Sequence, residues 1–187
     1  MFLPGFLSAI SRPKRLAFGV YGGWSQGLGY EFSWHWRSSR SDDYSLDLNL
    51  GAYVQYNLSA VFSIQSSVNF QHGTNDWIFR YPGWPYEEGT DKFRIVSGNL
   101  NGIINDRHWG AITFYLLGGG GITSGDWEAF RGTYFNLTAG AGVKVYISRS
   151  HPNLALNFGG TFVHLINPDE YEDYTADYLR FLIGIEF

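Results

Sequence analysis

Few side chains in this sequence could do chemistry inside a fold, and four of them are charged. Asp47, Lys144, Arg180 and Glu186 each stand in a segment whose other polar residues are Gly, Ser, Asn, Gln, Thr and Tyr. Acids and bases enclosed together are expected to pair, because a lone buried charge is costly. Such pairs could form a gate or a proton path, or they could plug the interior. Cysteine is absent and the five histidines are scattered, so we predict no thiolate chemistry, no metal site and no cofactor.

These charges stand in segments where apolar and polar residues alternate, which indicates strands with one apolar face. Between Tyr134 and Ile147, one face carries Phe, Leu, Ala, Val and Ile, and the other carries Tyr, Asn, Thr, Gly and Lys. Helical periodicity is hard to find. The eight alternating segments are Leu16–Tyr21, Ser45–Tyr56, Phe62–Phe70, Val96–Ile104, Ala111–Leu116, Tyr134–Ile147, Leu154–Phe162 and Tyr178–Phe187.

The links between these segments alternate in length. Three are short, at about 57–60, 105–109 and 148–153. The other four are longer, at about 26–43, 73–91, 123–131 and 167–176. In the first of these the alternation persists through Trp36, which indicates that the first two strands extend beyond the main sheet as a hairpin. An even number of strands joined in this way predicts an all-β, eight-stranded antiparallel up-and-down barrel with both termini on the short-link side. Residues 15–187 are expected to form this barrel, and residues 1–14 an N-terminal tail or signal remnant.

Alternation alone does not say whether the apolar face lies inside or outside the barrel. A soluble, lipocalin-like barrel would enclose that face around a ligand and cover its exterior with charges. Here charged residues make up only 16% of the chain, and the net charge of −4 argues against a nucleic-acid partner. The segments also approach the length of about 9–11 tilted residues that crosses a bilayer. The composition therefore favours a transmembrane β-barrel with a packed polar lumen, with the soluble barrel as the alternative.

Position along the strands arranges the four charges into two pairs. Asp47 and Arg180 lie near the long-link ends of their strands, and Lys144 and Glu186 lie near the short-link ends. The members of each pair are two strands apart, about 10 Å between backbones, which long side chains can bridge. We therefore predict the pairs Asp47–Arg180 and Lys144–Glu186. A lumen enclosed by eight strands is normally filled by side chains, so a structural plug is favoured over a gate.

Two stretches of the sequence resemble the bacterial outer-membrane eight-stranded β-barrel family, of the OmpX and OmpA-barrel type. They are LGAYVQYNLSAVFSIQSSVNF (Leu50–Phe70) and YLRFLIGIEF (Tyr178–Phe187), within a resemblance that spans about Arg15–Phe187. The closing Phe187 is similar to the terminal signal read by the outer-membrane assembly machinery. The resemblance implies the bacterial cell outer membrane as location, with short turns periplasmic and long loops outside. Membrane lipid and lipopolysaccharide are the partners it implies, and another envelope protein is a further candidate.

Some outer-membrane barrels of this kind modify lipid A. One class, the lipid A deacylases, has a late-strand histidine, a serine two residues on and an acid downstream. His164 resembles the histidine of that pattern, and the acids that follow it are Asp169, Glu170, Glu172 and Asp173. Two residues on from His164, however, stands Ile166. Without a hydroxyl nucleophile the triad is incomplete, so the sequence favours a protein that is not an enzyme and leaves lipid A modification as the alternative.

The long link at Asn75–Asp91 is the most distinctive stretch of the chain. It contains two prolines and five aromatic residues, which are Trp77, Phe79, Tyr81, Trp84 and Tyr86. Aromatic, proline-stiffened loops suit binding surfaces, although such a loop can also fold on itself or rest on the lipid interface. Together with the link at Gln26–Asp43, it predicts a plugged barrel that displays long extracellular loops for structural or interaction roles.

Overall fold

The computed structural model describes residues 16–28, 30–34, 38–80, 85, 87–106, 111–126, 132–147, 154–166 and 175–187. Most of these residues belong to strands, and none of them belongs to a helix that could cross a membrane. The strands are β1 (Leu16–Gly27), β2 (Tyr30–Trp34), β3 (Ser38–Asn57), β4 (Phe62–Arg80), β5 (Glu87–Asn105), β6 (Ile112–Gly125), β7 (Gly132–Tyr146), β8 (Ala155–Ile166) and β9 (Thr175–Glu186).

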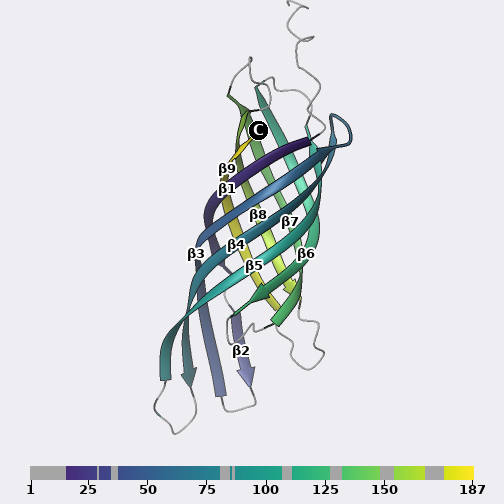
Figure 1. The fold of residues 1–187 in the computed structure, drawn as a ribbon. Helices are drawn as coiled ribbons and strands as arrows, with labels where there is room; N and C mark the ends of the chain where they lie inside the picture. Colours follow the sequence, from purple (N-terminus) through teal and green to yellow (C-terminus); the bar gives the residue numbers. More distant parts are fainter. Residues whose placement is uncertain are drawn as a thin grey trace, which may run out of the picture.

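Eight of these strands close into an antiparallel barrel (Figure 1). β1 completes the circle, because it pairs with β3 on one side and with β9 on the other. From β3 to β9 every neighbour in the wall is also the neighbour in sequence. The ninth strand, β2, lies beyond the end of β1 and pairs with β3 at Tyr30–Trp34. The predicted up-and-down barrel of eight strands is therefore confirmed.

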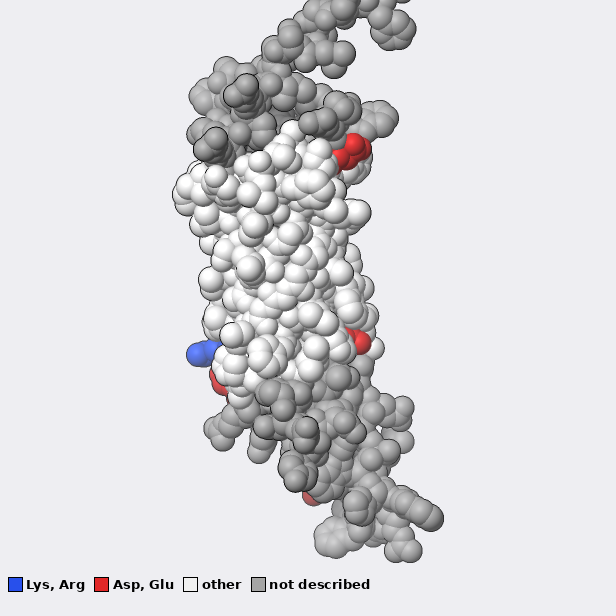
Figure 2. Space-filling view, turned by 90° about the vertical axis from the view of Figure 1, so that its right-hand side faces the viewer, with Lys and Arg blue, Asp and Glu red and all other residues white. Residues whose placement is uncertain are grey.

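The apolar faces of the strands point outward and the polar faces point into the lumen. Along β5, Leu100 is 62% exposed whereas its neighbour Asn99 is only 5% exposed. Asn49 and Gln65 are likewise buried. On the face drawn in Figure 2, acidic and basic side chains of the described residues lie toward the two ends, and the central belt is uncharged. This arrangement is the one predicted for a transmembrane barrel and is the reverse of a soluble one.

One side of the barrel is much taller than the other. β3, β4 and β5 have 20, 19 and 19 residues, whereas β8 and β9 have 12 each. Together with β2, the three long strands continue past the rim opposite the C-terminus (Figure 1). We call this part, which comprises β2, Ser38–Ser45, Thr74–Arg80 and Glu87–Arg94, the extension.

The sequence interpretation of Asn75–Asp91 as a loop was wrong, whereas the alternation through Trp36 correctly indicated a hairpin beyond the main sheet within Gln26–Asp43. Within Asn75–Asp91, β4 continues to Arg80 and β5 begins at Glu87. Within Gln26–Asp43, the chain forms β2 and the start of β3. The physical reason is that a sheet beyond the membrane has no lipid on its outer face. The apolar and polar alternation that identifies a membrane strand is not required there.

Candidate functional site

A buried ion pair lies at the short-link end of the lumen. Lys144 on β7 places its Nζ 2.6 Å from Oε2 of Glu186 on β9, and the two residues are only 2% and 6% exposed. Lys144 also donates a hydrogen bond of 3.0 Å to Oε1 of Gln55 on β3. The Tyr53 hydroxyl, also from β3, donates to Glu186 Oε2 at 2.7 Å. The structure thus brings Lys144 and Glu186 together and links both to β3, which lies across the lumen from β7 and two strands from β9.

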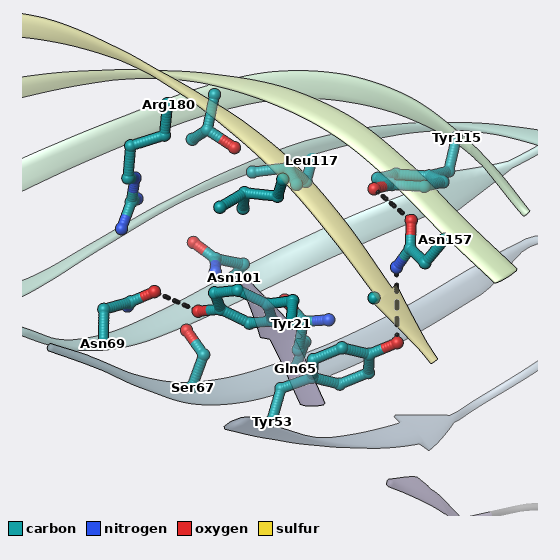
Figure 3. A pocket seen from close by; sticks show the side chains of 13 residues that line it. Tyr21, Tyr53, Gln65, Ser67, Asn69, Asn101, Tyr115, Leu117, Asn157 and Arg180 are labelled. Atoms are coloured by element: carbon teal, nitrogen blue, oxygen red, sulfur yellow. Dashed lines mark hydrogen bonds between the residues drawn. The ribbon is translucent and has the colours of Figure 1, made fainter. Parts of the chain in front are cut away.

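The network continues through an asparagine on β8. Asn157 donates from Nδ2 to the Tyr53 hydroxyl at 3.3 Å and accepts from the Tyr115 hydroxyl at 2.8 Å (Figure 3). The Lys144 ammonium lies 5.7 Å from the centre of the Tyr115 ring. Side chains from β3, β6, β7, β8 and β9 therefore meet in one layer. We call this layer, formed by Tyr53, Gln55, Tyr115, Lys144, Asn157 and Glu186, the plug.

The tyrosine rings of the lumen lie over glycines on the neighbouring strand. Tyr53 is opposite Gly19 and Tyr21 is opposite Gly51 in the register of β1 and β3. A side-chain carbon on Gly19 would lie 2.2 Å from the Tyr53 ring, and one on Gly51 would lie 2.4 Å from the Tyr21 ring. The two rings stack with their centres 6.1 Å apart. The glycines therefore let large rings lie across the lumen and fill it.

Arg180 on β9 lies nearer to the extension than the plug does. The residue is 4% exposed, and its guanidinium carbon lies 5.9 Å from the centre of the Tyr178 ring. Its predicted partner, Asp47, is in β3 at a bulge between Ser45 and Leu48, and the Asp47 side chain lies outside the described part of the structure. The pair Asp47–Arg180 therefore stays a prediction.

A small cavity lies between Arg180 and the plug residues Tyr53, Tyr115 and Asn157 (Figure 3). Its volume is about 40 Å³, which is enough for a few ordered water molecules and too small for a larger solute. Its lining residues are Tyr21, Tyr53, Gln65, Ser67, Asn69, Asn101, Tyr115, Leu117, Asn157, Thr161, Arg180, Leu182 and Gly184. Among the side chains that the structure describes, Arg180 Nε and Asn69 Nδ2 are buried there with no hydrogen-bond partner. Buried polar atoms are normally satisfied, so water is expected at these atoms.

Large apolar and aromatic side chains are buried in the lumen near the extension end. Phe93, Val163 and Tyr178 are each 1% exposed, and Leu165 is 2% exposed. They stand at inward positions beside buried polar residues such as Gln71 and Asn136, so the lumen near this rim is mixed in polarity. The sequence interpretation did not single them out, although their alternation with outward residues could have shown it.

On the outer wall, a histidine and an acid on two adjacent strands lie opposite each other. His164 on β8 is opposite Asp177 on β9, and His164 Nδ1 lies 2.6 Å from Asp177 Oδ1. Both side chains are partly exposed, at 33% and 40%. The sequence pointed to other acids, and those at positions 169, 170, 172 and 173 lie outside the described residues. Asp177 was missed because its contact with His164 depends on cross-strand register.

The aromatic residues expected to form a binding loop are only partly described. Trp77 and Phe79 belong to β4, with their side chains outside the description, and Tyr81, Trp84 and Tyr86 lie outside the described residues. Several described side chains nearby are polar and exposed, such as Thr90, whose hydroxyl donates to Asp76 Oδ1 at 2.6 Å. No group of three or more potential metal ligands gathers among the residues for which the structure gives positions.

Comparison with known proteins supports the fold. No protein-family model matches the sequence, and no curated protein matches it. Neisserial surface protein A (NspA) aligns with a TM-score of 0.60 at 12% identity, covering 92% of this chain and 96% of NspA. The outer membrane protein OprG of Pseudomonas aeruginosa aligns with a TM-score of 0.60 at 11% identity, covering 94% of this chain and 98% of OprG. The protein therefore has the fold of bacterial outer-membrane eight-stranded barrels, a fold that does not fix one activity.

Proposed function

We propose that this protein is a non-enzymatic barrel of the bacterial outer membrane, closed to solutes, whose extension serves structural or interaction roles outside the cell. The observation that carries the closed lumen is the plug, in which Lys144 and Glu186 join Gln55 and Tyr53 of β3. An outward apolar belt supports a membrane location. The short links then lie on the periplasmic side and the extension lies outside.

The plug closes the lumen both sterically and electrostatically. The rings of Tyr53 and Tyr21 lie inside the lumen over glycines of the neighbouring strand, where they occupy space that a channel would need. The charges of Lys144 and Glu186 are held 2.6 Å apart and are almost fully buried. A passing ion would have to separate that pair and leave each charge without its partner, which is costly in a buried site. A barrier of this kind suits a closed, structural barrel better than a conducting pore.

A planar lipid bilayer recording tests the closed lumen. We expect the wild-type protein to give no discrete current steps, while Tyr53→Ala, which removes a ring from the plug, gives detectable openings and shows that the assay can see them. Phe158→Ala, which shortens an outward apolar side chain on β8, is the matched control and should stay silent. Discrete steps in the nanosiemens range from the wild-type protein would overturn the proposal.

The expected partners lie outside the lumen. Lipid and lipopolysaccharide surround the apolar belt, and the extension is placed to meet another envelope protein or a neighbouring surface. Co-purification from gently solubilised native membranes tests this role. We expect the full-length barrel to retain a partner that a variant lacking residues 76–90 releases. Equal recovery of every co-purifying protein with both forms would contradict an interaction role for the extension.

A second candidate function, modification of lipid A on the outer wall, is favoured by the contact of His164 with Asp177. An acid that holds Nδ1 of a histidine leaves Nε2 to take a proton from water or a hydroxyl group. Ile166 stands where a serine nucleophile would be needed, so water would have to attack the ester. Incubation with acyl-labelled lipid A separates the two functions. Acyl release that is lost in His164→Ala would replace the non-enzymatic proposal.

A further inference from the structure

Among the described residues, the outer part of β5 is paired with a strand on one side and not on the other. β5 pairs with β4 along its whole length from Glu87 to Ile104, but it pairs with β6 only from Ile95 onward. Within the residues that the structure describes, no strand is paired with the other edge of β5 between Glu87 and Arg94. An open strand edge presents unpaired N–H and C=O groups and can template a further strand.

Hydrogen bonds at the rim show which residues direct their backbone groups toward this open edge. The Arg94 N–H donates to Asp126 Oδ1 at 2.6 Å, and the Asp126 N–H donates to the Arg94 carbonyl oxygen at 3.2 Å. Both backbone groups of Arg94 therefore point away from β4. Because this direction alternates along an antiparallel strand, the N–H and C=O groups of Glu88, Thr90 and Lys92 point to the same side, where β6 has already ended.

The side chains along this open edge are complementary to themselves. Glu88, Thr90 and Lys92 are all exposed, and neither charged residue has an ion-pair partner among the described side chains. When two copies of the edge pair antiparallel with Thr90 opposite Thr90, Glu88 of each copy lies opposite Lys92 of the other. Opposite charges in directly opposed positions stabilise a strand pair, and like charges destabilise it. One two-fold arrangement thus makes the same favourable contact twice.

We propose that the β5 edge at Glu88–Lys92 is a homotypic docking site for the same edge of a second copy in a facing membrane. This inference rests on the proposed function, which places the extension outside the membrane. Two copies in one membrane are related by rotation about the membrane normal, and that rotation does not reverse a strand along the normal. Copies in two facing membranes approach with their strands reversed, as antiparallel pairing requires. Each contact is short, and many copies acting together supply its strength.

Clustering of reconstituted vesicles tests this docking site. The full chain is placed in phosphatidylcholine vesicles, and turbidity reports clustering, with protein-free vesicles as the blank. Wild-type vesicles should cluster. Vesicles carrying only Lys92→Glu, or only Glu88→Lys, should cluster about tenfold more slowly, because like charges then face each other twice. A mixture of the two variant populations should cluster again, because an acidic edge then meets a basic edge. This rescue also shows that both variants are folded.

A proline substitution tests the backbone part of the contact. The Thr90 N–H points to the open edge, so Thr90→Pro removes a donor from the docking site without removing a backbone hydrogen bond between β4 and β5. It also removes the side-chain bond from Thr90 to Asp76, so Thr90→Val, which loses that bond and keeps the N–H, is the control and should cluster like the wild type. We expect Thr90→Pro vesicles to lose clustering while heat-modifiable migration in gels shows that the barrel is folded. Wild-type vesicles that stay dispersed, or variants that all cluster like the wild type, would overturn the docking site. Bilayer recordings on the same samples report on the plug separately, so either proposal can fail alone.

Discussion

Replacing Lys144 with methionine would remove one partner of the plug's ion pair and leave the other buried. Methionine keeps an unbranched side chain of similar length, so packing near the Tyr115 ring changes little. The Glu186 carboxylate would lose its contact at 2.6 Å, and Gln55 would lose the donor at 3.0 Å. The Tyr53 hydroxyl would remain as a hydrogen-bond donor to Glu186. The change is therefore a test of charge pairing with little loss of volume.

Breaking a buried pair by removing one partner typically costs about 3–5 kcal/mol, because an uncompensated charge stays buried. Lys144 and Glu186 are 2% and 6% exposed, so solvent screens this charge little. We expect Lys144→Met to lower the free energy of unfolding by about that amount. The double variant Lys144→Met with Glu186→Gln buries no net charge and should be more stable than Lys144→Met alone. Lys92→Met, at an exposed lysine of the extension, is the matched control and should stay within about 0.5 kcal/mol of wild type.

Urea unfolding of the protein in phospholipid vesicles measures these differences. The seven tryptophans of the chain supply a fluorescence signal, and gel migration before and after heating verifies that each variant folds. The reasoning would be refuted if Lys144→Met cost less than about 1 kcal/mol. It would also be refuted if the double variant lost as much unfolding free energy as Lys144→Met and Glu186→Gln lose in total when each is made alone. The two side chains would then be energetically uncoupled.

Further measurements test the lumen, the belt and the orientation of the barrel. Gly51→Val should fold poorly or lose about 1–3 kcal/mol, because the new side chain overlaps the Tyr21 ring, and unfolding by urea measures this. Leu100→Arg places a charge on the lipid face midway along β5 and should cost about 2–4 kcal/mol in vesicles, whereas Thr90→Arg on the extension should cost little. The chain has no cysteine, so single-cysteine variants are clean probes. In intact cells Thr90→Cys should react with an impermeant maleimide, and Asp106→Cys should react only after the outer membrane is permeabilised.

Sequence alternation predicted the barrel because the membrane imposes a strict requirement on every strand that crosses it. Outward residues must be apolar over the whole hydrocarbon thickness, as Leu100 and Leu137 are, while the lumen takes polar residues. That requirement ends at the rim. Beyond it, the outer part of β4 and of β5 contains Asp76, Glu87 and Glu88, which mimic a loop in composition although they pair as strands. The outer parts of β4 and β5 were therefore missed, whereas the alternation through Trp36 had indicated the hairpin that β2 forms with β3.

The contacts of the candidate site could be predicted where they depend on how far along its strand each residue stands. They could not be predicted where they depend on which residues of two strands lie opposite each other. Lys144 and Glu186 could be matched because both stand near the short-link ends of their strands. The contact of His164 with Asp177 depends on which residue of β8 lies opposite which residue of β9. The sequence of the link between the two strands does not reveal this register. The roles of Gln55 and Tyr53 were also missed. They come from β3, across the lumen, and only a closed barrel brings them to the ion pair.

An open strand edge is normally a hazard, since any neighbouring chain can add to it. Membrane anchoring changes that hazard, because it fixes how two copies can approach one another. Within one membrane every extension points the same way, so the open edge of β5 meets no reversed copy of itself. The charges at Glu88 and Lys92 then select the partner strand, because they favour one that places a basic residue opposite Glu88 and an acidic residue opposite Lys92. An edge that would aggregate in a soluble protein can in this way remain exposed beside its own copies and still pair across a gap between cells.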